Sequence, residues 1–183
     1  MCRRERINEL KKVKKIFNNS CVKAVDVSLN CKGKVIFAGI GKSGLIARKI
    51  SATFSSIGVP SFFCDPAQAL HGDMGQIEKK DILIIFSYSG NTSELNNMLK
   101  YANRNRIKII GVASKSDSLL LKASDVKLIL PKVKEADVTG MVPTSSTTIT
   151  LLLGDCLATT AMHQKKFSKE KFKIFHPGGN IGS

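Results

Sequence analysis

Five short apolar runs alternate with longer stretches in which apolar residues recur every three or four positions. Most of the runs are rich in Val and Ile, and each is shorter than an ordinary helix. They cover residues 34–38, 61–64, 81–86, 107–112 and 126–130. Because continuous apolar strands need both faces covered by helices, this alternation predicts an α/β fold with a five-stranded, mostly parallel sheet.

The 183 residues predict a single domain that is long enough to bury a hydrophobic core. Apolar residues at spacings of three and four predict an amphipathic N-terminal helix over about 4–29. The core of the domain is expected over about 33–164, and it includes a long apolar helix over 144–163. The C-terminal segment, 165–183, contains a His-Pro-Gly-Gly sequence.

The chain carries a formal net charge of +15, which raises the question of a polyanionic partner. Residues 1–32 hold a net +6 and residues 165–183 a net +4, so most of the excess lies in the flanks. Most basic residues are Lys, aromatic residues make up 6%, and there is no Trp for base stacking. This pattern favours a Lys-rich solvated surface, and we expect no nucleic-acid partner.

The apolar runs and the cysteines together predict a cytoplasmic protein with no membrane partner. No run approaches the ~18 residues that a membrane-spanning helix requires. The basic N-terminus leads into no apolar segment of the kind found in a secretory signal. The five cysteines are scattered without a C-x-x-C pair or a metal-ligand spacing, which is typical of reduced thiols.

A glycine-rich loop, Gly39-x-Gly41-x-x-Gly44, follows the first predicted strand and begins a helix. It matches the dinucleotide fingerprint, and Asp65 closes the second strand where a ribose-binding acid would stand. A nicotinamide enzyme is therefore one hypothesis. A more general interpretation is an anion site formed by helix N-terminal amides, with Lys42 supplying charge. The loop also suits simple packing of a strand against a helix.

A second loop, Ser87-Tyr-Ser-Gly-Asn-Thr-Ser-Glu94, follows the third predicted strand. Its small hydroxyl side chains and free helix N-terminal amides form a neutral cradle suited to a phosphate group. Gly90 lets the backbone approach a ligand closely. Both loops belong to the edge of a parallel sheet where ligands bind. The alternative is ordinary helix capping, with Glu94 as a capping-box acid.

Five motifs appear in order along the chain: Gly-Ile-Gly-Lys-Ser-Gly44, Pro66-Ala-Gln-Ala-Leu-His-Gly-Asp, Ser-Tyr-Ser-Gly-Asn-Thr-Ser-Glu94, Pro143-Thr-Ser-Ser-Thr-Thr and His176-Pro-Gly-Gly. Over about residues 30–182 the sequence resembles the sugar isomerase (SIS) domain family, and within it the D-arabinose 5-phosphate isomerases of the Kdo pathway. The resemblance implies a three-layer α-β-α, flavodoxin-like fold. Family members usually carry a pair of CBS domains after the last motif, and this sequence contains none.

The resemblance implies a cofactor-independent aldose–ketose isomerisation of D-ribulose 5-phosphate to D-arabinose 5-phosphate through an enediolate, which feeds lipopolysaccharide synthesis. It implies Lys42 as the electrostatic stabiliser, Glu94 or Glu135 as the base, and His176 in proton transfer or ring opening. The further positions that it implies in substrate or phosphate binding are Gly41, Ser43, His71, Ser87, Ser89, Gly90, Asn91, Thr92, Ser145, Ser146 and Thr147. It also implies a homotetramer with active sites between subunits.

Each of these positions also has a structural interpretation. Glu135 lies in a Lys-rich run typical of a solvated face, His176 suits a loop cap, and His71 suits a structural histidine. Gln68 stands where related sequences have Glu, and it cannot take a proton at neutral pH. Asp65 stands where they have a metal-contacting His, so no metal is expected. The alternative function is a non-catalytic SIS module that senses a phosphosugar.

Overall fold

The computed structural model describes residues 2–178, and in this part of the chain five strands form one sheet. The strands are β1 (Val35–Gly39), β2 (Ser61–Phe63), β3 (Ile82–Phe86), β4 (Lys108–Ala113) and β5 (Val126–Ile129). Their order across the sheet is β2-β1-β3-β4-β5, and every neighbouring pair is parallel. The predicted α/β fold is confirmed, since the five apolar runs are the five strands.

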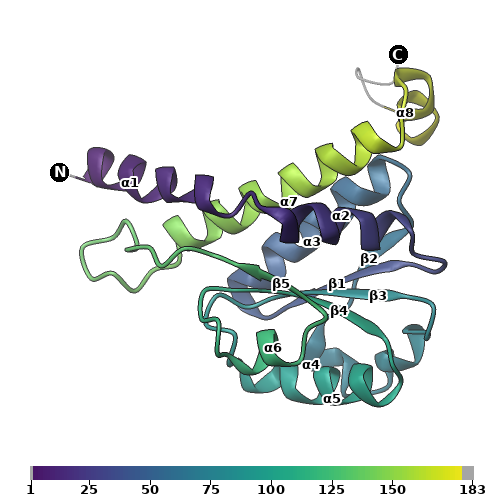
Figure 1. The fold of residues 1–183 in the computed structure, drawn as a ribbon, viewed down its shortest axis with the longest axis horizontal. Helices are drawn as coiled ribbons and strands as arrows, with labels where there is room; N and C mark the ends of the chain where they lie inside the picture. Colours follow the sequence, from purple (N-terminus) through teal and green to yellow (C-terminus); the bar gives the residue numbers. More distant parts are fainter. Residues whose placement is uncertain (1, 179–183) are drawn as a thin grey trace.

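Helices cover both faces of the sheet (Figure 1). The helices on one face are α1 (Cys2–Lys11), α2 (Asn19–Leu29), α3 (Gly41–Ser56) and α7 (Ser145–Gln164). Those on the other face are α4 (Pro66–Ala69), α5 (Asn96–Arg104) and α6 (Leu119–Lys122), with the 3₁₀ turns η2 (Asp73–Gln76) and η3 (Ser93–Leu95) in the same part of the chain. The last helix, α8 (Lys169–Phe175), lies at the far end of α7.

Alternating side chains of the central strands fill two separate cores. Phe37 packs in the core under α2, α3 and α7, where its ring lies against Phe54 and Phe86. Its neighbours Ile36 and Ala38 belong to the core on the α5 side. This alternation follows from the two-residue period of a strand, and it explains why β1 and β3 are apolar at every position.

The N-terminal helix expected over 4–29 is interrupted. The chain forms α1, then the 3₁₀ turn η1 (Lys12–Lys15), and begins a new helix at α2. Asn18 is in an extended conformation, and its side chain accepts a hydrogen bond from the Ser20 backbone N–H at 2.8 Å. An Asn at this position caps a helix start, so the apolar periodicity continues across the break while the helix does not.

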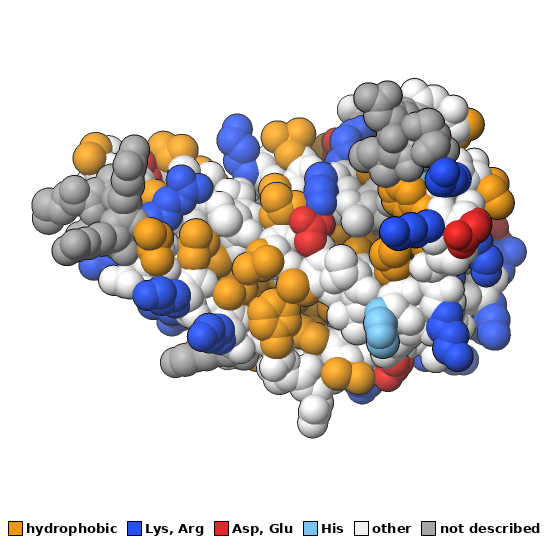
Figure 2. Space-filling model, turned by 90° about the horizontal axis from the view of Figure 1, so that it is seen from above, with side chains coloured by type: hydrophobic (Ala, Val, Ile, Leu, Met, Phe, Trp, Pro, Cys, Tyr) orange, Lys and Arg blue, Asp and Glu red, His pale blue; other side chains and the backbone are white. Residues whose placement is uncertain are grey.

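The outer face of the helical layer carries exposed apolar side chains, which gather near its middle in Figure 2. Part of this surface is a groove of about 340 Å³ between α2 and α7, lined by Phe17, Val22, Cys156 and their neighbours. Among residues 2–178, no helix is both long and apolar enough to cross a membrane.

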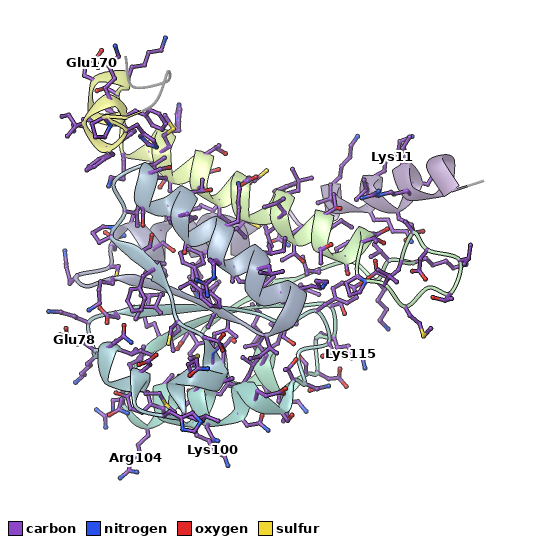
Figure 3. The ribbon with its side chains drawn as sticks, turned by 180° about the vertical axis from the view of Figure 1, so that it is seen from behind. Lys11, Glu78, Lys100, Arg104, Lys115 and Glu170 are labelled. Atoms are coloured by element: carbon purple, nitrogen blue, oxygen red, sulfur yellow. The ribbon has the colours of Figure 1, made fainter. Side chains whose placement is uncertain are left out.

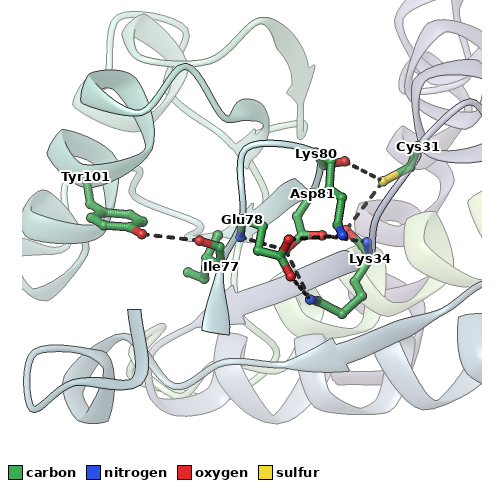
Figure 4. A network of polar contacts seen from close by, with 7 residues as sticks. All are labelled: Cys31, Lys34, Ile77, Glu78, Lys80, Asp81 and Tyr101. Atoms are coloured by element: carbon green, nitrogen blue, oxygen red, sulfur yellow. Dashed lines mark hydrogen bonds and ion pairs between the residues drawn. The ribbon is translucent and has the colours of Figure 1, made fainter. Parts of the chain in front are cut away.

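A buried carboxylate joins the starts of β1 and β3, at the edge of the sheet opposite the strand ends that carry the loops (Figure 4). Asp81 is 2% exposed, and its two oxygens accept hydrogen bonds from the backbone N–H groups of Lys34 and Glu78, at 2.7 and 2.8 Å. The Lys34 ammonium lies 3.5 Å from the same carboxylate. Asp81 therefore satisfies two backbone donors that the sheet itself leaves unpaired.

Replacing Asp81 by Ala should lower the free energy of unfolding by about 2–4 kcal/mol, because two buried N–H groups lose their acceptor. Glu78→Gln is the matched control, since the Glu78 side chain is half exposed and its ion pairs with Lys34 and Lys80 are on the surface. It should change the free energy of unfolding much less than Asp81→Ala does, because exposed ion pairs contribute little to stability. Urea denaturation measures both, and equal effects would contradict the role of Asp81.

Candidate active site

A cavity of about 460 Å³ lies at the edge of the sheet where the strands end. It is formed by the loop after β1, the loop after β3, the segment 131–144 and the first turns of α7. Its polar lining residues include Lys42, Ser43, Ser89, Glu135, Ser146 and Thr147. Six positions singled out in the sequence, from four separate segments, therefore meet in one cavity.

The glycine loop places Lys42 in the first turn of α3. Gly44 is required there, because a Cβ at this position would lie 2.6 Å from the Gly39 carbonyl oxygen. Ile40 is the residue before the helix, and its apolar side chain cannot accept a capping hydrogen bond from the first amides. The first amides of α3 thus face the edge of the sheet without an internal carboxylate, which favours an external anion.

The hydroxyl loop after β3 is folded around Ser87. The Ser87 and Thr92 hydroxyls lie 2.8 Å apart, and the Gly90 N–H donates to the Ser87 hydroxyl at 3.1 Å. Gly90 has φ +71°, and a Cβ there would lie 2.2 Å from the Ser118 Oγ, so only glycine fits. The Asn91 side chain accepts from the Leu119 N–H at 2.9 Å and holds the outer end of the loop.

Glu135 is a carboxylate at the N-terminus of α7. Its Oε2 accepts hydrogen bonds from the backbone N–H groups of Thr144 and Ser146, at 2.8 and 3.2 Å, and from the Thr144 hydroxyl at 3.2 Å. Burial raises the pKa of the Glu135 carboxyl, but hydrogen bonds from Ser146 and Thr144 outweigh it and leave the pKa below its usual value. Glu135 is therefore ionised at neutral pH and lines the cavity.

The loop between Glu135 and α7 is organised by a second carboxylate. Asp137 accepts hydrogen bonds from the backbone N–H groups of Thr139, Met141 and Val142 and from the Thr139 hydroxyl. The Thr139 hydroxyl is the main cause that lowers the pKa of Asp137 to about 2. The loop thus keeps its turn at neutral pH, and it brings Gly140 and Met141 to the cavity wall.

Tyr88 is a lining residue that the sequence analysis did not single out. Its hydroxyl donates to the Pro131 carbonyl at 3.1 Å and accepts from the Val133 N–H at 2.9 Å. Burial raises the pKa of Tyr88, so the phenol stays protonated and donates. In the sequence, the sign that Tyr88 belongs to the site is its position between Ser87 and Ser89. Its hydrogen-bond partners lie more than 40 residues further along the chain, so no local pattern reveals them.

Several candidate residues lie outside the cavity wall. Glu94 is exposed on η3 and accepts from the Ser93 hydroxyl at 2.8 Å. His71 is exposed after α4. Ser145 is fully buried, and its hydroxyl has no hydrogen-bond partner among the described residues. The other candidates that do not line the cavity are Gly41, Ser87, Gly90, Asn91 and Thr92, which belong to the two loops described above.

His176 lies at the opposite end of the molecule from the cavity. It follows α8, its Nδ1 is 2.8 Å from the Phe172 carbonyl oxygen, and its ring stacks on Phe172 at 3.8 Å. The 20 residues of α7 separate α8 from the cavity, a helix length of about 30 Å. In Figure 3, Glu170 on α8 and Lys11 on α1 mark the two ends. The last Gly of the His-Pro-Gly-Gly sequence lies outside the described residues.

No group of three or more His, Cys, Asp or Glu side chains suited to a metal ion occurs within residues 2–178. Asp65, the acid that suggested a ribose contact, caps α4 instead by accepting from the Ala67 N–H at 2.9 Å. Its carboxylate therefore already has a structural partner.

Comparison with known proteins identifies the fold and the family. An uncharacterised protein of Rickettsia prowazekii is 46% identical over 87% of this chain and 50% of its own length. The arabinose 5-phosphate isomerase KdsD of Escherichia coli O157:H7 is 44% identical over 83% of this chain and 46% of its own length. This chain thus spans about half the length of these curated relatives.

A solved structure of an Escherichia coli CFT073 protein in complex with arabinose 5-phosphate superposes with a TM-score of 0.87. The two chains are 38% identical, and the match covers 93% of this chain and 92% of that one. The sequence model of the SIS domain family matches residues 28–160, which include the glycine loop, the hydroxyl loop and the start of α7. The chain belongs to the SIS domain family.

Proposed function

We propose that this chain is the isomerase domain of a phosphosugar isomerase that interconverts D-ribulose 5-phosphate and D-arabinose 5-phosphate. One observation carries the proposal: a single cavity holds a cation, Lys42, an ionised carboxylate, Glu135, and several hydroxyl groups. The relative named for arabinose 5-phosphate and the related structure in complex with that sugar phosphate support this substrate class.

The substrate phosphate binds to the hydroxyl loop after β3 and the start of α7. Ser89 and Thr147 offer hydroxyls on two sides of the cavity. Ser87 and Thr92, which bond to each other in the free chain, exchange that contact for phosphate oxygens. Hydroxyls and helix N-terminal amides bind a phosphate dianion without a metal ion or a full set of counter-charges.

The reaction moves one proton between two adjacent carbons. The base removes a proton from C1 of the ketose, and the C2 carbonyl becomes an enediolate oxygen, whose charge the Lys42 ammonium stabilises. The same proton, or one from solvent, then adds to C2. As the C1 aldehyde forms, the C1 hydroxyl gives up its proton and the C2 oxygen takes one up, so the substrate and the product are isomers and no redox partner is consumed.

Glu135 is the base that the geometry favours over Glu94. Glu135 lines the same cavity as Lys42, and the backbone hydrogen bonds from α7 and the residue before it both go to its Oε2. Neither of these two backbone bonds goes to its Oε1. Glu94 is exposed and lies outside the cavity wall. Gln68 is also exposed and has no proton-accepting form at neutral pH.

His176 enters the site from a second copy of the chain. Within one chain the length of α7 keeps it away from Lys42 and Glu135, so a contribution to the reaction needs another subunit. The apolar groove between α2 and α7 offers a surface for such an assembly. A homotetramer would place several such sites between its subunits.

The decisive assay mixes the protein with ribulose 5-phosphate and follows the appearance of arabinose 5-phosphate by NMR, with other pentose and hexose phosphates run in parallel. Conversion of the pentose phosphate supports the proposal. Tight binding with no conversion of any sugar phosphate would instead identify a sensor module. A change in NAD(P)H fluorescence on mixing with the protein would point to the dinucleotide interpretation of the glycine loop.

Replacing Glu135 by Gln should lower kcat by about 10²- to 10⁴-fold, because the amide cannot accept the C1 proton. Its amide oxygen still accepts from the Thr144 and Ser146 N–H groups, so binding of arabinose 5-phosphate, measured by calorimetry, should stay within about threefold of the parent. Unchanged turnover would assign the base to another residue.

The pH profile offers an independent test of the base. Because the pKa of Glu135 is lowered, its carboxylate stays ionised as the pH falls to its usual pKa of 4.5. Titration of Glu135 should therefore produce no acidic limb in kcat/KM between about pH 5 and about pH 8. An acidic limb in this range that remains after allowance for the ionisation of the substrate phosphate would contradict Glu135 as the base.

Mixing two inactive variants tests the shared site. Glu135→Gln and His176→Ala should each be nearly inactive alone. After dissociation and joint reassembly in equal amounts, about a quarter of the parent activity should return, because mixed pairs contain one intact site. No recovery, in an assembly shown by mass spectrometry to be mixed, would place His176 outside the reaction.

A further inference from the structure

We propose that Glu9, on α1, is a positioning residue that fixes the segment carrying Glu135, and this inference rests on Glu135 being the base in the proposed function. Glu9 belongs to the N-terminal region that precedes the family match at residue 28. Figure 1 shows α1 lying beside the segment 131–144, far from it in sequence.

The Glu9 carboxylate forms a direct bond to the residue before Glu135. Its Oε2 accepts a hydrogen bond from the Lys134 backbone N–H at 2.9 Å, across 125 residues of sequence. The Glu9 side chain is 16% exposed. The Lys12 ammonium donates to both carboxylate oxygens at 2.8 and 2.7 Å, and this fixes the orientation of the acceptor. A hydrogen bond to an ionised group is stronger than a neutral one.

Glu9, Lys12 and Tyr88 hold the segment before Glu135 from two sides. The Tyr88 hydroxyl bonds to the carbonyl of Pro131 and the N–H of Val133. On the other side, the Lys12 ammonium lies 3.5 Å from the carbonyl oxygen of residue 132, and Glu9 takes the N–H of residue 134. Backbone groups of successive residues point to opposite sides of an extended chain. Tyr88 therefore holds the groups of residues 131 and 133 on one side while Lys12 and Glu9 hold those of 132 and 134 on the other.

Glu9 acts on the reaction through the backbone rather than by touching the sugar. It lines a separate groove of about 650 Å³ on the outer side of the segment 131–144, and Glu135 lines both this groove and the cavity that contains Lys42. Without Glu9, the segment keeps its Tyr88 contacts and Glu135 keeps its bonds to α7. The chain should therefore stay folded while the carboxylate loses part of its fixed position.

The experiment compares Glu9→Ala and Glu9→Gln with the control Glu78→Gln, whose parent residue also pairs with lysines but lies at the opposite edge of the sheet. For ribulose 5-phosphate, Glu9→Ala should lower kcat about 10- to 100-fold, because a small misplacement of a catalytic group is costly, and should leave KM within about twofold. Glu9→Gln retains an oxygen acceptor for the Lys134 N–H, so its kcat should lie within about threefold of the parent. Hydrogen exchange of the Lys134 amide should accelerate in Glu9→Ala and not in Glu78→Gln.

Parent-like kcat in Glu9→Ala, with an active parent enzyme, would overturn the role of Glu9 and leave the proposed function intact. Equal losses in Glu9→Ala and Glu9→Gln, with a raised KM and a lower melting temperature, would also overturn it, because they indicate a general loss of structure. An inactive parent enzyme would count against the proposed function itself, and the positioning role would fall with it.

Discussion

The pairing of β1 with β3 determines where the chemistry of this chain can occur. Gly39, the last residue of β1, stands opposite Phe86, the last residue of β3. Since the two strands are parallel, the glycine loop and the hydroxyl loop leave the sheet side by side at the same edge. At the other end of the same pair, Asp81 joins the strand starts through buried hydrogen bonds. The register of two strands thus places Lys42, the hydroxyls of Ser43 and Ser89, and the N-terminus of α3 at one cavity.

Glu135 affects the charge of this cavity in two ways. As a carboxylate at the N-terminus of α7, it satisfies amides that would otherwise attract an anion, and these bonds keep it ionised. As a lining residue, it presents negative charge opposite Lys42. In the proposed function, the phosphate is held by the hydroxyl loop and by the Thr147 hydroxyl, and the reacting carbons face the Glu135 carboxylate. Glu9 and Tyr88 accept hydrogen bonds from the two residues before Glu135, and these bonds hold the backbone that carries the carboxylate.

The sequence predicted the sheet well because its central strands β1 and β3 are buried at every position, and such strands are apolar throughout. It predicted the N-terminal helix poorly, because the apolar period continues through the cap at Asn18. The two loops could be placed because each directly follows a strand. The position of Glu135 could not be placed, because its Lys-rich neighbours suggest a solvated face while its partners come nine and eleven residues later. The separation of His176 from the cavity depends on the direction that α7 takes along the sheet, which no local pattern encodes.

The most direct test of this account is a crystal structure of the protein with arabinose 5-phosphate bound. In that structure, the phosphate should lie on the Ser87–Thr92 loop and contact the first turn of α7. C1 and C2 of the sugar should lie between the Lys42 ammonium and the Glu135 carboxylate. A sugar bound with its phosphate on the glycine loop, or with C1 and C2 remote from Glu135, would contradict the central claim.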